Sequence, residues 1–296
     1  MKVRVEVGTA EQKALILEEF TILEHVAAAA NVTHRIAEVV VPGDFDSAVR
    51  RLSGDQVFQA NRGYHLVLAK TVPVEGGDCL LISPVLFTEG FDTQVRIRLY
   101  LHELMHVVHR TRFPSRAGES QATHYYLENL YCLYDDYAAE RRSLEICAEL
   151  FPEPSELYAR FHRTTFYGFL KALNDESVYR TLSNAVVRFR LGFLDIEGFQ
   201  TAVRPLFDQI AKSLAYGAAY IDSRTGFEQD LSTFVNARFV SDAAQRLVAY
   251  FASKYEADDY DLSDGVERMK NFTETFGFVF EDHPEGLYCR VVGLPF

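Results

Sequence analysis

The chain has 296 residues, of which 48% are hydrophobic and 24% are charged, with only 9 prolines and 17 glycines. This composition is typical of a folded protein with a sizeable core, and it excludes a disordered or fibrous chain. The formal net charge is −12, which would repel a phosphate backbone, so we expect no nucleic-acid partner. The sequence has neither a signal-peptide pattern at its start nor an apolar run of about 18 residues, which predicts a cytoplasmic protein with no membrane partner.

The four cysteines are widely separated along the chain. None of them belongs to a CxxC pair or to another cluster with the spacing of metal ligands. We therefore expect them to be reduced core residues; they are Cys79, Cys132, Cys147 and Cys289.

The first ninety residues, 1–90, combine strand-like and helical patterns. Alternation and turn residues predict strands over 2–7, 35–41, 65–72 and 79–88, and helices over 9–30 and 46–52. Gly76-Gly77 supplies the positive φ that a hairpin turn needs, so the last two strands should pair antiparallel. Pro84 would be poorly tolerated in a central strand, and for that reason we place the strand 79–88 at the edge of the sheet.

The remainder of the chain is almost entirely helical in pattern. A long helix is expected over 92–110, ending near Phe113-Pro114, because proline disfavours helical geometry in the residue before it. Residues 286–292 are expected to return as a short strand or to pack as an apolar plug. Further helices are predicted over 120–133, 135–150, 155–174, 176–190, 195–214, 231–254 and 263–275.

The long helix carries the pentapeptide His102-Glu103-Leu104-Met105-His106, which matches HExxH. At 100° per residue, His106 lies about 40° from His102 and Glu103 about 100° from it, so all three share one face. Two imidazoles one helical turn apart, with a carboxylate beside them, are the arrangement that a tetrahedral Zn²⁺ and a general base require. The opposite face is an apolar stripe for the core, formed by Ile97, Leu101, Leu104 and Val108.

A catalytic zinc normally takes three protein ligands, so a third must come from elsewhere in the chain. The metzincin spacing HExxHxxGxxH fails here, because His109 occupies the glycine position and Arg112 the last histidine position. A later helix offers Asp136 and Glu140, which are four residues apart and therefore share a face.

At this point the sequence resembles the gluzincin-type zincin metallopeptidases, in which HExxH is followed by a helix with an acidic ligand and, four residues on, a second acid. The closest likeness is to the E-Y-x-A-D pattern of the HtpX-like and CAAX-prenyl-protease-like group, read here as Asp136-Tyr137-Ala138-Ala139-Glu140. The resemblance covers residues 102–140 and implies that Asp136 is the third ligand, while Glu140 orients a histidine ring. Asp136 replaces the family's glutamate, and Glu140 replaces its aspartate.

Two alternatives for the third ligand stay open. Glu140 is the ligand if the chain follows the soluble zincin-like peptidases that act on repressors. Glu128 is a third candidate, although the residue four positions on is Cys132 rather than an acid.

The order of elements implies a zincin-like α+β fold. Residues 1–150 would form the catalytic core, with a small mixed N-terminal sheet and its helices, the HExxH helix and the third-ligand helix. Residues 151–296 would form a helical C-terminal lobe packed on that core. In zincins, an extended peptide adds along the edge strand beside the cleft.

The function expected from these features is zinc-dependent hydrolysis of peptide bonds in a peptide or protein substrate. His102, His106 and Asp136 would bind Zn²⁺, and Glu103 would be the general base that takes a proton from water. The alternative is a non-catalytic, zincin-like module that binds a protein partner and has a structural or vestigial metal site. His124, Tyr137 and His162 are possible oxyanion donors, but we expect each to be a packing residue. The oligomeric state is not encoded in these patterns.

Overall fold

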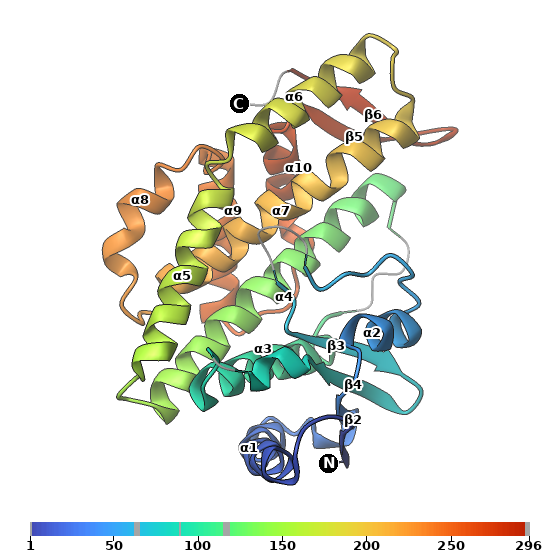
Figure 1. Cartoon of the computed structure of the whole chain (residues 1–296). Helices are drawn as coiled ribbons and strands as arrows, with labels where there is room; N and C mark the ends of the chain where they lie inside the picture. Colours follow the sequence, from blue (N-terminus) through green and yellow to red (C-terminus); the bar gives the residue numbers. More distant parts are fainter. Residues whose placement is uncertain (1, 62–65, 89, 115–118, 294–296) are drawn as a thin grey trace. The chain divides into compact units, whose positions relative to one another are not determined.

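A small mixed β-sheet lies in the N-terminal part of the chain, and most of the remaining chain is helical (Figure 1). The computed structural model describes residues 2–61, 66–88, 90–114 and 119–293. The protein is therefore of the α+β class, as the sequence predicts.

The chain divides into two compact units. One contains Met1–Arg112 and Ala139–Thr165, and the other contains Phe113–Ala138 and Phe166–Phe296. Each unit draws on two segments of the chain, whereas the sequence predicts a single division after residue 150. The difference arises because the division passes through one continuous helix, α4 (Gln121–Leu150).

The sheet has the strand order β1-β2-β4-β3. β2 lies parallel to both β1 and β4, whereas β3 pairs antiparallel with β4, which makes the sheet mixed. The strands are β1 (Lys2–Val5), β2 (Ile36–Val41), β3 (Ala69–Val74) and β4 (Gly77–Ile82).

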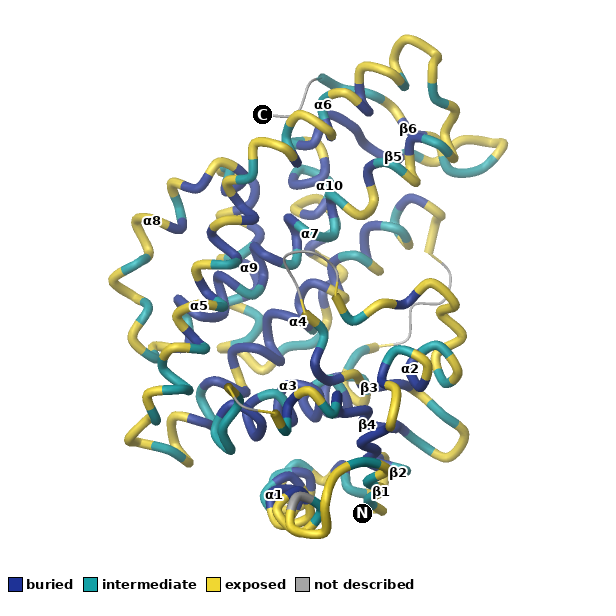
Figure 2. The backbone as a smooth tube through the Cα atoms, in the orientation of Figure 1, coloured by how far each residue is buried: buried dark blue, intermediate teal, exposed yellow. Residues whose placement is uncertain are grey.

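The two faces of the sheet are covered by different helices. Alternate residues of a strand point to opposite faces. Val39 and Val41 accordingly join a core cluster with α1 (Ala10–Ala29) and α3 (Thr93–Arg110), while Val40 joins a second cluster with α2 (Phe45–Ser53). Helix α3 contacts α1 as well as the strands β3 and β4, and Figure 2 shows most of its backbone as buried.

The predicted hairpin is present, but its edge assignment was wrong. β4 lies between β2 and β3, so β3 is the edge strand and carries Pro73, which the edge tolerates. Pro84 does not lie in a strand, because β4 ends at Ile82 and Pro84 begins a short 3₁₀ helix, Pro84–Phe87. The first residue of the predicted strand 65–72 lies outside the described residues.

One glycine of the hairpin turn is required by a close approach of two backbones. Gly77 has a φ of 147°, and a Cβ atom on it would lie 2.2 Å from the carbonyl oxygen of Arg35. A side chain at this position would therefore separate β4 from the residues that precede β2.

The later helices begin close to their predicted starts, with three differences in extent. The predicted helices 120–133 and 135–150 are one helix, because neither glycine nor proline interrupts them. The predicted helix 195–214 continues to Asp222, and the predicted helix 231–254 is two helices. These elements are α5 (Glu156–Ala172), α6 (Glu176–Arg190), α7 (Ile196–Asp222), α8 (Leu231–Val235), α9 (Asp242–Glu256) and α10 (Val266–Glu274).

The C-terminal segment returns as a strand, one of its two expected forms. β6 (Gly286–Val291) pairs antiparallel with β5 (Phe278–His283), a strand that the sequence analysis missed. Among the described residues, no helix combines the length and apolar character that a bilayer crossing requires.

The cysteine expectation holds for three of the four thiols. Cys79, Cys147 and Cys289 are buried, but Cys132 is exposed on α4. Burial raises the pKa of Cys79 and Cys147 to about 11 and that of Cys289 to about 12, so these thiols stay protonated near neutral pH.

A buried ion pair ties α3 to α1. The Nε atom of Arg96 donates to Oε2 of Glu19 at 3.0 Å, and Nη1 donates to the carbonyl oxygen of Phe91 at 2.6 Å. Both charged side chains are less than a tenth exposed, at 8% for Arg96 and 2% for Glu19. Removal of one partner would leave the other charge buried and uncompensated.

We expect Arg96→Met to lower the free energy of unfolding by about 3–5 kcal/mol, measured by urea denaturation. Adding Glu19→Gln should restore part of that loss, because the uncompensated charge is then removed as well. Arg180→Met is the matched control: its pair with Glu176 is exposed, so the change should stay below about 1 kcal/mol. Equal effects of Arg96→Met and Arg180→Met would show that the buried pair does not hold α3.

Candidate metal centre

The HExxH helix α3 begins at a clear sequence signal. The Asp92 carboxylate accepts a hydrogen bond from the backbone N–H of Val95 at 3.0 Å, which caps the first turn. The helix runs for 18 residues to Arg110. It thus holds His102 and His106 one turn apart on a rigid and largely buried element.

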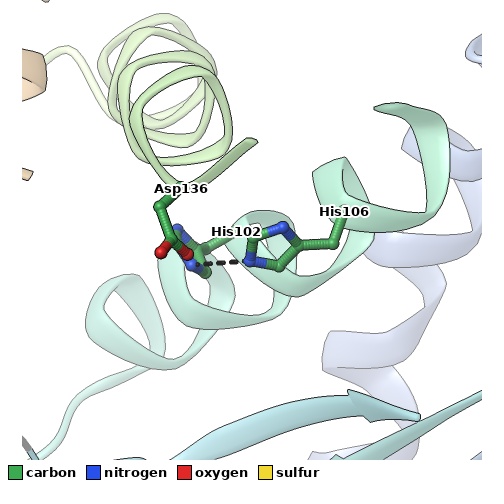
Figure 3. A group of neighbouring side chains, drawn as sticks. All are labelled: His102, His106 and Asp136. Atoms are coloured by element: carbon green, nitrogen blue, oxygen red, sulfur yellow. Dashed lines mark hydrogen bonds between the residues drawn. The ribbon is translucent and has the colours of Figure 1, made fainter. Parts of the chain in front are cut away.

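The two histidines of the motif face each other at close range. Their Nε2 atoms lie 3.1 Å apart and their ring planes are nearly perpendicular, at 89° (Figure 3). Two nitrogen ligands of one tetrahedral zinc ion are separated by about 3.3 Å, given the usual Zn–N bond lengths. The spacing of these nitrogens therefore suits a shared metal ion.

The carboxylate of Glu140, on α4, lies next to the Nδ1 side of the His102 ring. Oε2 of Glu140 is 3.0 Å from Nδ1 of His102, and Glu140 also forms an ion pair with Arg98. All three side chains are buried. A carboxylate at Nδ1 favours the tautomer in which Nε2 has a free lone pair, which is the state a metal ligand needs.

Asp136 lies one turn before Glu140 on α4, so its carboxylate projects from the same face of that helix. Figure 3 shows the Asp136 side chain pointing from α4 toward the ring of His102. One potential ligand atom from each of His102, His106 and Asp136 lies within 4.8 Å of the others. The structure thus brings together the three residues that the sequence predicts as ligands.

Two residues of α7 hold the Asp136 carboxylate. The hydroxyl of Tyr216 donates to Oδ1 at 2.9 Å, and the ammonium of Lys212 lies 3.0 Å from Oδ2. The negative charge of Asp136 raises the pKa of Lys212 above its ordinary value. Both oxygens of the carboxylate therefore already have a donor.

Glu103, the predicted general base, is held by the sheet. Its Oε2 accepts hydrogen bonds from the backbone N–H of Thr71 at 2.6 Å and from the hydroxyl of Thr71 at 2.8 Å. Thr71 belongs to β3, and both side chains are buried. Oε2 accepts both hydrogen bonds from Thr71, so Oε1 of Glu103 takes part in neither of them.

The remaining candidates lie apart from this group. Glu128, the third alternative for the ligand, forms an i,i+4 pair with His124 at 3.2 Å, and both side chains are about half exposed, at 58% and 49%. Tyr137 is buried and its hydroxyl donates to Asp222 at 2.6 Å. Tyr137 is thus a packing residue, as expected, whereas His124 is an exposed member of an ion pair and not a packing residue.

His162 is also a packing residue. It is buried against the ring of Tyr158, with the ring centroids 4.0 Å apart. Burial, together with the nearby Arg98 cation, lowers its pKa well below the ordinary value, so the ring is neutral near pH 7.

Sequence reasoning missed four residues that surround the group: Arg98, Thr71, Lys212 and Tyr216. Arg98 had a detectable signal, because it lies one turn before His102 on α3. Lys212 and Tyr216 share a face of α7 for the same reason, but nothing in the sequence connects that face with Asp136. Thr71 is placed by the strand order of the sheet, which a local pattern does not contain.

No protein-family model, curated protein or solved structure matches this chain.

The Thr71–Glu103 contact predicts a measurable contribution to stability. Thr71→Val keeps the shape of the side chain and the backbone N–H but removes the hydroxyl donor to a buried carboxylate. We expect the free energy of unfolding to fall by about 1.5–3 kcal/mol, measured by urea denaturation.

Thr181→Val is the control, because Thr181 is exposed on α6 and donates only to the carbonyl oxygen of Ser177 in its own helix. Its effect should stay within about 0.5 kcal/mol. A Thr71→Val chain as stable as the parent would mean that the hydroxyl does not hold Glu103.

Proposed function

We propose that this chain is a zinc-dependent metallopeptidase in which His102, His106 and Asp136 hold the metal and Glu103 is the general base. The observation that carries the proposal is the convergence of these three ligand atoms within 4.8 Å. The zincin-like order of elements, with a mixed sheet, an HExxH helix and then an acid-bearing helix, supports it by analogy.

The chemistry of the donor set fits zinc. Two imidazoles and one carboxylate are the protein ligands of many catalytic zinc sites, which keep a fourth position open for water or substrate. The Glu140 carboxylate beside Nδ1 of His102 supplies the outer contact that such histidines usually have. Of the two acids of α4, this favours Asp136 as ligand and Glu140 as the residue that orients the ring.

Bound zinc would lower the pKa of water toward about 7 and polarise a carbonyl group. The part of Glu103 is to accept the proton of the attacking water and to deliver it to the leaving amine. Thr71 restrains Oε2 of Glu103, which leaves Oε1 as the oxygen for proton transfer. This restraint would keep the base in one position during attack.

A specific observation also supports the second candidate, a non-catalytic module that binds a protein partner. The outward-facing backbone groups of β3 belong to Ala69, Thr71 and Pro73, because Thr71 donates away from β4 to Glu103. The N–H of Thr71 is taken by Glu103 and Pro73 has none. A peptide that added as a strand along β3 would therefore meet few free backbone N–H donors. Glu103 would then have a structural role, joining α3 to β3 through Thr71.

Metal content tests the site itself. We expect about one zinc per chain in protein purified without added metal, measured by inductively coupled plasma analysis. His102→Ala and Asp136→Ala should each abolish tight binding, whereas Glu140→Ala should weaken it by about 10–100-fold in competition with a chromogenic chelator. The reason is that a ligand bonds to the ion directly, while Glu140 acts through the orientation of a ring.

Glu128→Ala is the matched control on the same helix and should leave the zinc affinity unchanged. If Glu140→Ala proves far more damaging than Asp136→Ala, the two assignments are reversed. If neither variant matters, the third ligand lies elsewhere in the chain.

Hydrolysis tests the role of Glu103. We expect Glu103→Gln to retain zinc and to lose cleavage of a fluorescent casein substrate, because the amide keeps the shape of the side chain but cannot accept a proton. Equal cleavage by parent and variant would remove Glu103 from the mechanism. A parent chain that holds zinc and cleaves neither casein nor a panel of unfolded peptides would favour the non-catalytic module.

A further inference from the structure

The Asp136 carboxylate is already neutralised by a cation of the chain itself. The ammonium of Lys212 lies 3.0 Å from Oδ2 of Asp136. This contact lies within one compact unit, so it does not depend on α3.

A divalent cation and the Lys212 ammonium would compete for the negative charge of the Asp136 carboxylate. Coulomb energy grows as the distance shrinks, so a metal ion bound to Asp136 would be strongly repelled by an ammonium 3 Å from one of the carboxylate oxygens. The Lys212 side chain is long and 45% exposed, which gives it room to withdraw into solvent. Metal binding would therefore have to break the Lys212–Asp136 ion pair.

Tyr216 contacts the same carboxylate without this conflict. Its hydroxyl is neutral and donates to Oδ1 at 2.9 Å. A carboxylate oxygen has two lone pairs and can accept this bond while the group also binds a metal ion. Tyr216 would hold Asp136 in the same orientation with and without metal.

We propose that α7 sets the metal affinity of this site through two residues with opposite effects. Lys212 is a tethered cation that occupies Asp136 when metal is absent and is displaced when metal binds, whereas Tyr216 positions Asp136 for the metal. The proposal rests on the proposed function only in taking Asp136 as a ligand. Metal binding would then be weakened by the free energy of the Lys212–Asp136 ion pair that it displaces.

Zinc affinity, measured by competition with a chromogenic chelator at fixed pH and salt, tests the proposal directly. We expect Lys212→Met to tighten zinc binding by at least about tenfold, because the competing charge is gone. Lys212→Arg should stay close to the parent, since it restores the charge. Tyr216→Phe should instead weaken binding, by up to about tenfold, because Asp136 loses an orienting donor.

Lys2→Met is the matched control. It makes the same change at an exposed ion pair with Glu38 on β1 and β2, and β1 is the strand farthest from β3 in the sheet order. Its zinc affinity should equal that of the parent. Lys212→Gln serves as a second neutral variant, and circular dichroism confirms that each variant is folded.

The outcomes separate this proposal from the proposed function. Zinc binding by the parent with equal or weaker binding by both Lys212→Met and Lys212→Gln overturns the competing role of Lys212 and leaves the metal site standing. Binding only after Lys212 is replaced supports the competition. Failure of the parent and all variants to bind zinc overturns the metal site itself, and the proposal with it.

Discussion

The contact between Glu140 and His102 fixes which side of α4 faces the HExxH helix. At 3.0 Å from Nδ1 of the ring, the Glu140 carboxylate sets the rotation of α4 about its axis. Asp136, one turn earlier, is then on the same face, and the third potential ligand atom of the group comes from it rather than from Asp135 or Glu128. The ion pair with Arg98 secures the contact, because Arg98 comes from α3, like His102.

The parts of the site that follow helical periodicity were predictable from the sequence. HExxH in a continuous helix and two acids four residues apart are both local patterns, and the structure places Asp136 and the two histidines together. The small N-terminal sheet and the helical remainder were predictable for the same reason. Strand order was not, because Pro84 and Pro73 each permit an edge position and only the long-range pairing of β2 with β4 decides between them.

The residues that complete the surroundings of the group come from tertiary packing. Lys212 and Tyr216 lie on α7 and reach Asp136 from a distant part of the sequence. A lysine and a tyrosine four residues apart on a long helix are common on solvated faces, so the pattern carried no information about a partner. Their importance follows only from burial of Asp136, which makes every contact with its charge energetically large.

Asp136 and Glu140 lie one turn apart on α4 and differ in side-chain length by one methylene group. The shorter Asp136 therefore reaches less far from the axis of α4 than Glu140 does. Ala139 is fully buried in the same core cluster as Ile97 and Leu101 of α3, and its small side chain permits close packing of the two helices. The longer Glu140 can then reach both Nδ1 of His102 and the guanidinium of Arg98. The extra methylene of Glu140 thus serves contacts with two partners on α3, while the shorter Asp136 is held by Tyr216 and Lys212 of α7.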